Sequence, residues 1–258
     1  MPIYRLPDDD ILFPRPELAE PDGLLAVGGD VRPERLLAAY SLGIFPWSSE
    51  DEPILWWCPH PRAVLEPDQL HVSRSLKKRL RQGRFTVSCD RAFEQVIHAC
   101  AHTRLDVGED TWLYPELARS FLTLHQAGLA HSVEVWSGAE LVGGLYGLQL
   151  GNAYFGDSMF STGRDTSKVA FVHLVAYLRA IGVELIDCQL PTPHLSSLGV
   201  GEISRRSFLK RLRAAMEKVT PQHPWSWPPP GLTTEQALAP WLDVEAPDDS
   251  PGPRGGTE

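Results

Sequence analysis

Residues 183–199 read Val-Glu-Leu-Ile-Asp-Cys-Gln-Leu-Pro-Thr-Pro-His-Leu-Ser-Ser-Leu-Gly, and this stretch decides how the chain is interpreted. Its apolar start predicts a buried strand. Side chains alternate along a strand, so we expect Asp187 and Gln189 on one face and Cys188 on the other. Pro191 and Pro193 end the strand, because proline has no amide hydrogen for ladder pairing.

A carboxylate beside a carboxamide at the end of a strand forms a hydrogen-bonding pair that is suited to holding a reacting group. A solvent-facing polar edge explains the strand equally well when the strand is considered alone. The choice between these two interpretations therefore depends on the neighbouring segments.

The composition is that of a globular protein large enough to bury a full core: 258 residues, 43% hydrophobic and 22% charged. No apolar run reaches the roughly 20 residues that span a bilayer, and the first residues lack a signal-peptide pattern. The cysteines are scattered, with no Cys-x-x-Cys pair. We therefore expect a cytoplasmic protein with reduced thiols at Cys58, Cys89, Cys100 and Cys188.

The charge is distributed unevenly along the chain. A formal net charge of −9 argues against a nucleic-acid partner for the chain as a whole. However, residues 71–91 contain seven Lys and Arg against one Asp, residues 204–213 contain five and no acid, and residues 234–258 contain six acids and one Arg. Charges act over about 8 Å at physiological salt, so a basic face can coexist with an acidic tail. An ordinary solvated helix face explains either basic cluster taken alone.

The pattern of elements predicts a mixed α+β protein in three parts. Residues 1–62 are rich in Pro, Gly and aromatic residues and predict a small N-terminal domain, with loops pinned by tryptophans around a helix over 33–41. Residues 63–219 alternate between helical and strand patterns and predict the larger domain. Residues 220–258 are rich in Pro and acids and predict a loosely packed extension.

Start and stop signals locate the elements of the larger domain. Ser73 is expected to cap a basic helix that stops at Gly83, and Asp90 is expected to cap the next helix. The expected helices are 73–82, 91–102, 114–126, 166–181 and 205–216, and the expected strands are 131–136, 140–150, 152–155 and 183–189.

Several further motifs occur in a fixed order along the chain. They are Phe13-Pro14, 21–30 (Pro-Asp-Gly-Leu-Leu-Ala-Val-Gly-Gly-Asp), 43–47 (Gly-Ile-Phe-Pro-Trp), 54–59 (Ile-Leu-Trp-Trp-Cys-Pro), 141–147 (Leu-Val-Gly-Gly-Leu-Tyr-Gly), 156–161 (Gly-Asp-Ser-Met-Phe-Ser) and 165–168 (Asp-Thr-Ser-Lys). Together with residues 183–199, this ordered set resembles the leucyl/phenylalanyl-tRNA–protein transferases, enzymes that add Leu or Phe to proteins beginning with Arg or Lys. The resemblance covers roughly residues 11–215.

The resemblance implies an acetyltransferase-like (GNAT-like) fold for the larger domain, in which a central sheet splays open to form a cleft. It implies transfer of Leu or Phe, with Met as a further candidate, from aminoacyl-tRNA to the α-amine of the acceptor protein, which creates an N-degron. It also implies Asp187 and Gln189 as the catalytic pair. An aminoacyl ester is already activated, so the chemistry requires no cofactor and no metal.

The residue types suggest how the work is divided. The Gln189 side-chain oxygen is expected to orient the amine while its carboxamide donates to Asp187; a neutral amide is a poor base, so Asp187 is the expected proton acceptor. Asp157 stands where the family pattern usually has Glu, and its implied role is contact with the aminoacyl-adenosine end or the amine, with a reach shorter by about 1.5 Å. Asp157 and Glu202 are candidates for pairing with the cationic acceptor side chain.

Apolar and aromatic residues in these motifs are candidates for holding the donor. Met159, Leu145 and Phe160 can line a pocket for the Leu or Phe side chain, because methionine adapts to branched and aromatic shapes. Trp47 and Trp112 can stack on the terminal adenine. Core packing is the alternative explanation for all five residues.

The helix expected over 73–82 carries four cations at offsets of three, four and seven residues, so they share one face. These are Arg74, Lys77, Lys78 and Arg81. Such a stripe suits the phosphate backbone of tRNA and carries little sequence information. We expect the chain to bind tRNA through this stripe, with no membrane association and as a monomer.

Two other functions remain open at this point. An N-acyltransferase that uses acyl-coenzyme A needs a glycine-rich pyrophosphate loop, and residues 163–168 are the nearest, poor match. A non-enzymatic tRNA-binding protein would explain the basic helices but leave the pair of Asp187 and Gln189 without a purpose. His98 and His102 share a helix face, but no third ligand lies at a suitable spacing, so no metal site is expected.

Overall fold

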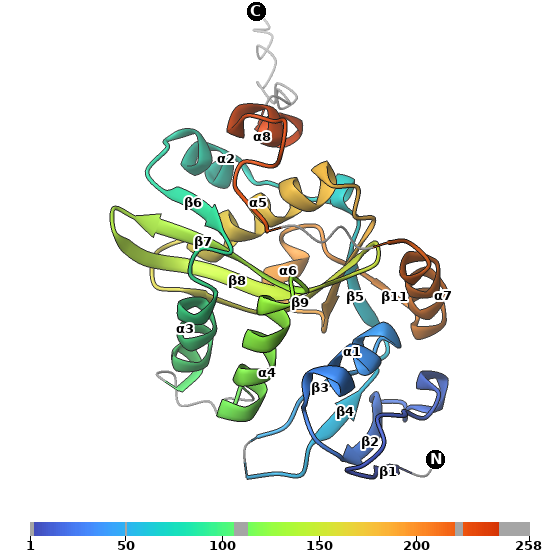
Figure 1. Cartoon of the computed structure of the whole chain (residues 1–258). Coiled ribbons are helices and arrows are strands. Elements are labelled where there is room, and N and C mark those ends of the chain that lie inside the picture. The colour runs from blue at the N-terminus through green and yellow to red at the C-terminus, as the bar shows by residue number, and fades with distance from the viewer. Residues whose placement is uncertain (1–2, 50, 106–112, 220–223, 243–258) are drawn as a thin grey trace, which may run out of the picture.

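The computed structural model describes residues 3–49, 51–105, 113–219 and 224–242, and it contains two β-sheets with helices packed around them (Figure 1). The predicted mixed α+β class is confirmed. The larger sheet has the strand order β11-β5-β10-β9-β8-β7-β6. Its strands are β5 (Arg62–Leu65), β6 (Thr86–Cys89), β7 (Ala130–Ser137), β8 (Glu140–Leu150), β9 (Ala153–Ser161), β10 (Leu185–Gln189) and β11 (Gly201–Ile203).

Helices cover both faces of the larger sheet (Figure 1). The buried helix α5 (Thr166–Ala180) packs with Val133, Val135 and Leu145 in one apolar cluster. The helices α3 (Phe93–Leu105) and α4 (Pro115–Gln126) pack in a second cluster that contains Tyr146 and Phe155. Neighbouring residues of one strand thus belong to opposite layers, as the alternation of side chains along a strand requires. The remaining helices are η1 (Pro16–Leu18), α1 (Pro33–Ser41), η2 (Pro67–Gln69), α2 (Arg74–Arg81), α6 (Pro193–Ser196), α7 (Arg205–Met216) and α8 (Thr234–Leu242).

The N-terminal part forms a four-stranded sheet, where the sequence predicted only loops around one helix. Its order is β1-β2-β4-β3, with β1 (Tyr4–Leu6), β2 (Leu24–Gly28), β3 (Phe45–Pro46) and β4 (Leu55–Trp57). These strands have two to five residues, which is too short for a period-two pattern to stand out. The expected pinning by tryptophan does occur, since Trp56 is fully buried and donates through Nε1 to the Gly28 carbonyl oxygen at 2.9 Å.

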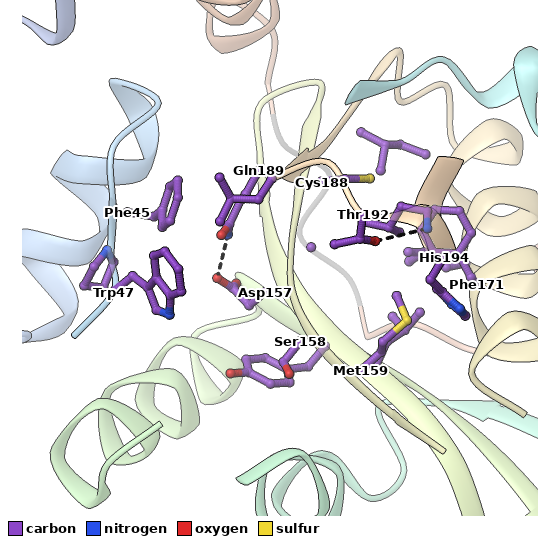
Figure 2. A pocket seen from close by; sticks show the side chains of 18 residues that line it. Phe45, Trp47, Asp157, Ser158, Met159, Phe171, Cys188, Gln189, Thr192 and His194 are labelled. Carbon is purple, nitrogen blue, oxygen red and sulfur yellow. Dashed lines mark hydrogen bonds between the residues drawn. The ribbon is translucent and has the colours of Figure 1, made fainter. Parts of the chain in front are cut away.

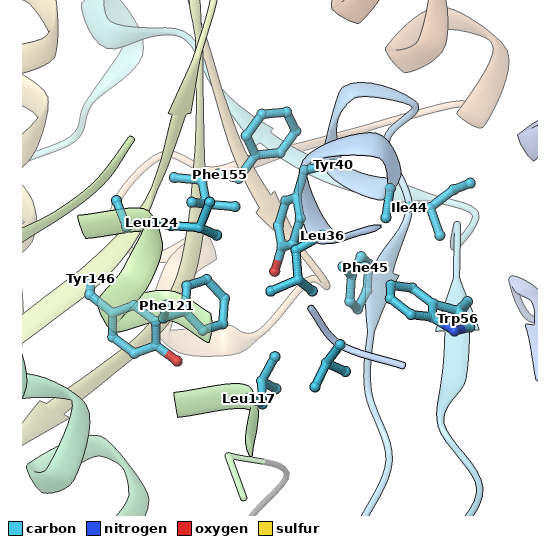
Figure 3. Close-up of a cluster of buried hydrophobic side chains, with 14 of the residues drawn as sticks. Leu36, Tyr40, Ile44, Phe45, Trp56, Leu117, Phe121, Leu124, Tyr146 and Phe155 are labelled. Carbon is cyan, nitrogen blue, oxygen red and sulfur yellow. The ribbon is translucent and has the colours of Figure 1, made fainter. Parts of the chain in front are cut away.

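This small sheet and the large sheet share an apolar cluster, drawn in Figure 3. The ring of Tyr40, at the end of α1, meets Phe155 of β9 edge-on with centroids 5.4 Å apart, and Phe121 of α4 at 6.5 Å. The hydroxyl of this buried Tyr40 is thereby held beside the strands of the larger sheet. Packing between the two parts therefore fixes a polar group at their junction.

The strands β9 and β10 run parallel and then separate. Their pairing ends where Asp187 lies opposite Phe155, while β9 continues to Ser161 and β10 to Gln189. On its other side β10 pairs with β5, and the register shifts between Asp187 and Gln189, where Gln189 adopts a left-handed φ of 62°. A bulge of this kind bends its strand and re-aims the side chains.

The predicted helix signals are largely confirmed. Ser73 caps α2, since its Oγ accepts the Leu76 amide at 3.3 Å, and the helix stops before Gly83, which has a φ of +58°. Asp90 does not cap α3, contrary to the prediction. Its Oδ1 accepts the Ser132 amide at 2.9 Å, and its Oδ2 lies 2.7 Å from Nδ1 of His131. The carboxylate therefore joins neighbouring parts of the sheet instead of starting a helix.

The C-terminal segment is packed in the part that the structure describes. Trp225, Leu238 and Trp241 are buried in the cluster built around α5, and the Trp225 amide donates to Asp90 Oδ2 at 3.1 Å. The prediction of loose packing is therefore wrong for residues 224–242, because Leu238 and Trp241 lie three residues apart on one side of α8 and pack in this cluster despite the local Pro content. Within the described ranges, none of the helices has the length and apolar character needed to span a membrane.

Candidate active site

A cavity of about 280 Å³ opens where β9 and β10 separate (Figure 2). Its walls come from the two parting strands, from β8, from the middle of α5, from α6 and the segment that leads into it, and from β3 of the small sheet. Backbone that turns away from a neighbouring strand leaves space at the strand end, and here side chains of both strands face that space.

Most of the cavity wall is apolar. Leu145 and Met159, which are cross-strand partners of β8 and β9, line it together with Phe171 and Leu174 of α5 and Ile186 of β10. Phe160 does not line it, contrary to the prediction. Phe160 follows Met159 along β9 and therefore points to the opposite layer, where it is 2% exposed in the cluster that contains α3.

Asp157 is the acidic residue that lines this cavity. Tyr40 donates a short hydrogen bond to its Oδ1, and Nε2 of Gln189 donates to the same oxygen at 3.2 Å. Oδ2 is shielded from solvent and has no hydrogen-bond partner among the residues that the structure describes. The Asp157 carboxyl thus offers one free oxygen beside the cavity.

Burial raises the pKa of Asp157 to about 8, against the hydrogen bonds from Tyr40 and Gln189, which lower it. The buried charge of Asp187 also raises this pKa, and no cation touches the Asp157 carboxyl in the described residues. Burial and the neighbouring Asp157 raise the pKa of Tyr40, so its hydroxyl stays a donor. Asp157 can therefore exchange a proton close to neutral pH.

Asp187 is in the opposite situation. It is 0% exposed, and both of its oxygens accept from the guanidinium of Arg62, from Nε at 2.8 Å and from a terminal nitrogen at 2.6 Å. The guanidinium of Arg62 lies over the rings of Phe45 and Phe208, at 4.9 and 4.4 Å from their centroids. This fork-to-carboxylate geometry fixes Asp187 with its charge fully compensated.

The predicted side-chain pair of Asp187 and Gln189 is replaced by a different contact. The backbone amide of Gln189 donates to Asp187 Oδ1 at 2.9 Å, while the Gln189 carboxamide donates to Asp157. Cys188 and Gln189 both line the cavity, whereas Asp187 points to Arg62. The bulge after Asp187 breaks the period-two alternation on which the prediction depended.

The other residues that were predicted to contact substrates lie in different places. Trp47 lies at the cavity rim, 43% exposed, with its ring 6.0 Å from that of Trp57. Trp112 lies outside the described residues. Glu202 is exposed on β11, at the edge of the sheet, and does not line the cavity.

The predicted basic stripe on α2 is partly covered. Lys77 lines a hollow against Pro240 and Trp241 near the C-terminus, and Arg81 donates to the carbonyl oxygen of Leu242. Arg81 is nevertheless exposed, as are Arg74 and Lys78. The C-terminal segment therefore occupies the side of α2 that two of the four predicted cations share.

The side chains near the cavity fit proton transfer better than nucleophilic catalysis. Burial raises the pKa of the Cys188 thiol far above its usual value, which keeps it protonated and a poor nucleophile. Among the described side chains, no group of three His, Cys, Asp or Glu could hold a metal ion.

Tyr40 and Arg62 were missed by the sequence reasoning. Tyr40 contacts a residue 117 positions away, and Arg62 a residue 125 positions away. The one local signal is that Arg62 begins the otherwise apolar run Arg-Ala-Val-Leu, because a charge in a buried strand needs a partner.

Two family models match the chain. The model described as leucyl/phenylalanyl-tRNA protein transferase matches residues 64–213, and the model described as its N-terminal domain matches residues 29–60. Among solved structures, the L-PGS of Bacillus licheniformis is 13% identical with a TM-score of 0.37, covering 73% of this chain and 65% of that one.

Curated relatives are similar over nearly their whole length. The chain is 54% identical over 225 residues to the leucyl/phenylalanyl-tRNA–protein transferase of Anaeromyxobacter sp. (strain Fw109-5), covering 87% of this chain and 95% of the relative. It is 54% identical over 239 residues to that of Desulfatibacillum aliphaticivorans, covering 93% and 100%. It is 53% identical over 212 residues to that of Stutzerimonas stutzeri (strain A1501), covering 81% and 93%.

Proposed function

The chain belongs to the leucyl/phenylalanyl-tRNA–protein transferase family, and from this premise we propose that the cavity between β9 and β10 is where the transfer takes place. The enzyme moves Leu or Phe, with Met as a further candidate, from aminoacyl-tRNA to the α-amine of a protein that begins with Arg or Lys. The observation that carries the site is Asp157, a carboxyl beside an apolar pocket with one oxygen that has no partner among the described residues.

The apolar wall receives the side chain of the transferred amino acid. Leu145, Met159, Phe171 and Leu174 present aliphatic, thioether and aromatic surface, which suits both a branched and an aromatic side chain. Trp47 at the rim is placed to stack on the terminal adenine, a contact worth about 1–3 kcal/mol per base. The donor ester would then lie between this rim and the deeper apolar wall.

Asp157 handles the proton of the attacking amine. An α-amine has an ordinary pKa of roughly 7.7–8.0, and burial brings that of Asp157 to about 8. Proton exchange between two groups of matched pKa is close to thermoneutral, which favours general-base catalysis. Gln189, on the neighbouring strand β10, orients the same carboxyl through its 3.2 Å hydrogen bond.

The step is balanced as follows. The amine nitrogen forms a bond to the ester carbonyl carbon and gives its proton to Asp157. The bond between that carbon and the ribose oxygen then breaks, and the ribose oxygen takes the proton from Asp157 and leaves as a hydroxyl. The products are a new peptide bond and a deacylated tRNA, and Asp157 is again a carboxylate for the next acceptor protein.

Asp187 acts through Gln189 as a positioning residue. Its carboxylate is saturated by Arg62 and by the Gln189 backbone amide, which locks the bulge that aims the carboxamide at Asp157. Asp187 does not line the cavity, because its two oxygens face Arg62 and the Gln189 amide. We therefore assign the proton to Asp157 and the scaffold to Asp187.

The proposal extends to the architecture and the setting. The separation of β9 and β10 supports an acetyltransferase-like domain over residues 63–219, with a small domain over 1–62 and an extension over 220–258. The free carboxyl oxygen of Asp157 supports pairing with a cationic acceptor. A monomer that works in the cytoplasm, where aminoacyl-tRNA is available, completes the proposal, and its product carries an N-degron.

A transfer assay tests this function. The protein is incubated with radiolabelled Leu-tRNA and a model protein that begins with Arg, and label is followed into protein. Label should enter this acceptor and not an otherwise identical acceptor with an acetylated N-terminus. Absence of label with both acceptors would contradict the function. If acetyl-coenzyme A, but not Leu-tRNA, modified the acceptor, the protein would instead be an acyl-coenzyme A-dependent enzyme.

A further inference from the structure

A second hollow, of about 900 Å³, lies beside α7, away from the apolar cavity. Its wall includes Arg205, Arg206, Lys210 and Arg213 of α7, together with His60. Glu17 is the acid that lines it. The hollow therefore gathers positive charge in a concave surface, which raises the local potential more than a flat surface would.

Two of these cations already have partners. Arg205 donates to the carbonyl oxygens of Ala19 and Glu20 at 2.8 and 2.7 Å, and Arg213 is ion-paired with Glu17. These contacts hold α7 against the N-terminal part of the chain.

Arg206 and Lys210 are left over. Both are exposed, and within the described ranges neither forms an ion pair. They are four positions apart on α7, which puts them on one face about 5–6 Å apart at Cβ. The buried residues Phe208 and Leu212 lie on the opposite side of the helix, while Leu209 lines the hollow.

The charge pattern of α7 does not favour the helix itself. Its first turn holds Arg205 and Arg206 and no acid. Cations at a helix N-terminus oppose the macrodipole at a cost of typically 0.3–1 kcal/mol each. Helices α1, α3, α4 and α8 each have a Glu in the first turn. A polyanion bound in the hollow would compensate the unfavourable charge.

Some of the cations on α2 already contact other parts of the chain, which favours a second surface for tRNA. Lys77 and Arg81 contact the C-terminal segment, and Arg79 pairs with Asp165 at 3.1 Å. Arg74, Lys78 and Arg81 of the four predicted phosphate contacts on α2 are exposed, and Arg81 already donates to the carbonyl oxygen of Leu242. A tRNA body held by α2 alone would therefore meet fewer cations than the sequence suggests.

Helix α7 is also connected to the cavity. The ring of Phe208 packs on Arg62, whose guanidinium holds Asp187. One side of α7 therefore supports the residues that aim Gln189, while the other side carries the free cations. A donor whose aminoacyl end enters the cavity would have its negatively charged body outside, within reach of such a surface.

We propose that the hollow beside α7, with Arg206 and Lys210 as its contacts, binds the phosphate backbone of the donor tRNA. This rests on the proposed function, which makes tRNA the donor, and extends it to a surface that is separate from the cavity and from α2. Charge complementarity selects this occupant, because the cations of the hollow suit phosphates and would repel an acceptor that begins with Arg or Lys.

The test removes both cations in the variant Arg206→Ala/Lys210→Ala. Binding of fluorescein-labelled tRNA is followed by anisotropy over a range of KCl concentrations. Each phosphate contact that is lost lowers the slope of log affinity against log salt by roughly 0.7–0.9, so the pair should lower it by about 1.4–1.8. The matched control is Arg5→Ala/Arg119→Ala, which removes the same charge from two exposed residues on β1 and α4. The control should leave the slope as in the unaltered protein.

Transfer kinetics separate the hollow from the cavity. The variant Arg206→Ala/Lys210→Ala should have a lower kcat/KM with Leu-tRNA but an unchanged one with leucyl-adenosine, a donor that has no tRNA body. An unchanged salt slope, or the same fall in the control variant, would overturn the proposal. A rise in KM for the acceptor protein, with tRNA binding unaffected, would overturn it as well and assign the hollow to the acceptor.

The experiments distinguish a failure of the proposed function from a failure of the proposal about the hollow. If the unaltered protein transferred Leu from neither donor, the function would be wrong. If the unaltered protein transferred Leu from both donors, the function would stand. If the variant Arg206→Ala/Lys210→Ala then showed the same slope of log affinity against log salt as the unaltered protein, the hollow would be excluded as a tRNA contact.

Discussion

Asp187 on β10 and Asp157 on β9 stand on either side of the point where these strands part, and they differ in every contact that matters for a proton. Asp187 is fully buried with a guanidinium on both oxygens. Asp157 has a phenol and a carboxamide on one oxygen and no partner on the other within the described residues. The comparison supports the proposed division, in which the compensated carboxylate builds the scaffold and the uncompensated one takes the proton.

The largest expected effect separates the two aspartates by rate. Asp157→Asn removes the proton acceptor and keeps the shape, so the rate of transfer from leucyl-adenosine should fall by roughly 10²–10⁴, the range for lost acid–base help. The matched control is Asp68→Asn, which alters an exposed aspartate paired with Arg179 on the surface. A single-turnover measurement checks this. A near-normal rate in Asp157→Asn would break the distinction between the two residues.

The next effect separates them by stability. Asp187→Ala leaves the buried guanidinium of Arg62 without its counter-charge, so the free energy of unfolding should fall by about 3–5 kcal/mol in a denaturant titration. Removing a partner from the exposed pair, by Asp68→Ala, should cost about 0–1 kcal/mol. The double variant Arg62→Met/Asp187→Leu should recover most of the stability, because the uncompensated charge is gone. Equal losses in Asp187→Ala and Asp68→Ala would contradict a compensated buried pair.

The third effect is a pH dependence of stability at Asp157, smaller because solvent reaches this residue in part. Its folded pKa of about 8 lies above the ordinary 3.8, so the protonated form is favoured by folding. That contribution is complete below the ordinary pKa and is lost as the pH rises through about 8. Asp157→Asn does not titrate, so its stability relative to the unaltered protein should grow between these two pH values and then level off. A difference that stays constant across thermal melts in this range would argue against a raised pKa.

The smallest effect concerns Tyr40. Its hydrogen bond lowers the pKa of Asp157 against the larger effect of burial. Tyr40→Phe should therefore shift the acid limb of the rate profile to higher pH, by up to about one unit, which corresponds to a rate loss of up to about tenfold at neutral pH. Profiles for kcat/KM in the two proteins test this. A shift to lower pH would mean that Tyr40 does not donate to Asp157.

The sequence predicted the regular elements well and the contacts between distant segments poorly. Helix α7 spans Arg205–Met216 as expected, because the helical spacing of its apolar residues is a local signal. The side-by-side pairing of Asp187 and Gln189 failed, since a bulge after Asp187 leaves no trace in a period-two pattern. Arg62 could not be matched with Asp187 for a different reason. A contact between residues 125 positions apart is set by the topology of the sheet, and no local motif predicts it.

The most direct test of the central claim is the pH profile of kcat/KM with an acceptor peptide whose nucleophile does not itself titrate near 8. An aminooxy group at the peptide N-terminus meets this need, because it is already deprotonated across the range. With leucyl-adenosine as donor, the rate should rise about tenfold per pH unit and bend near the pKa of Asp157, about 8. In Asp157→Asn the profile should be low and flat. A bend that survives in Asp157→Asn, or a flat profile in the unaltered protein, would contradict the assignment of the proton to Asp157.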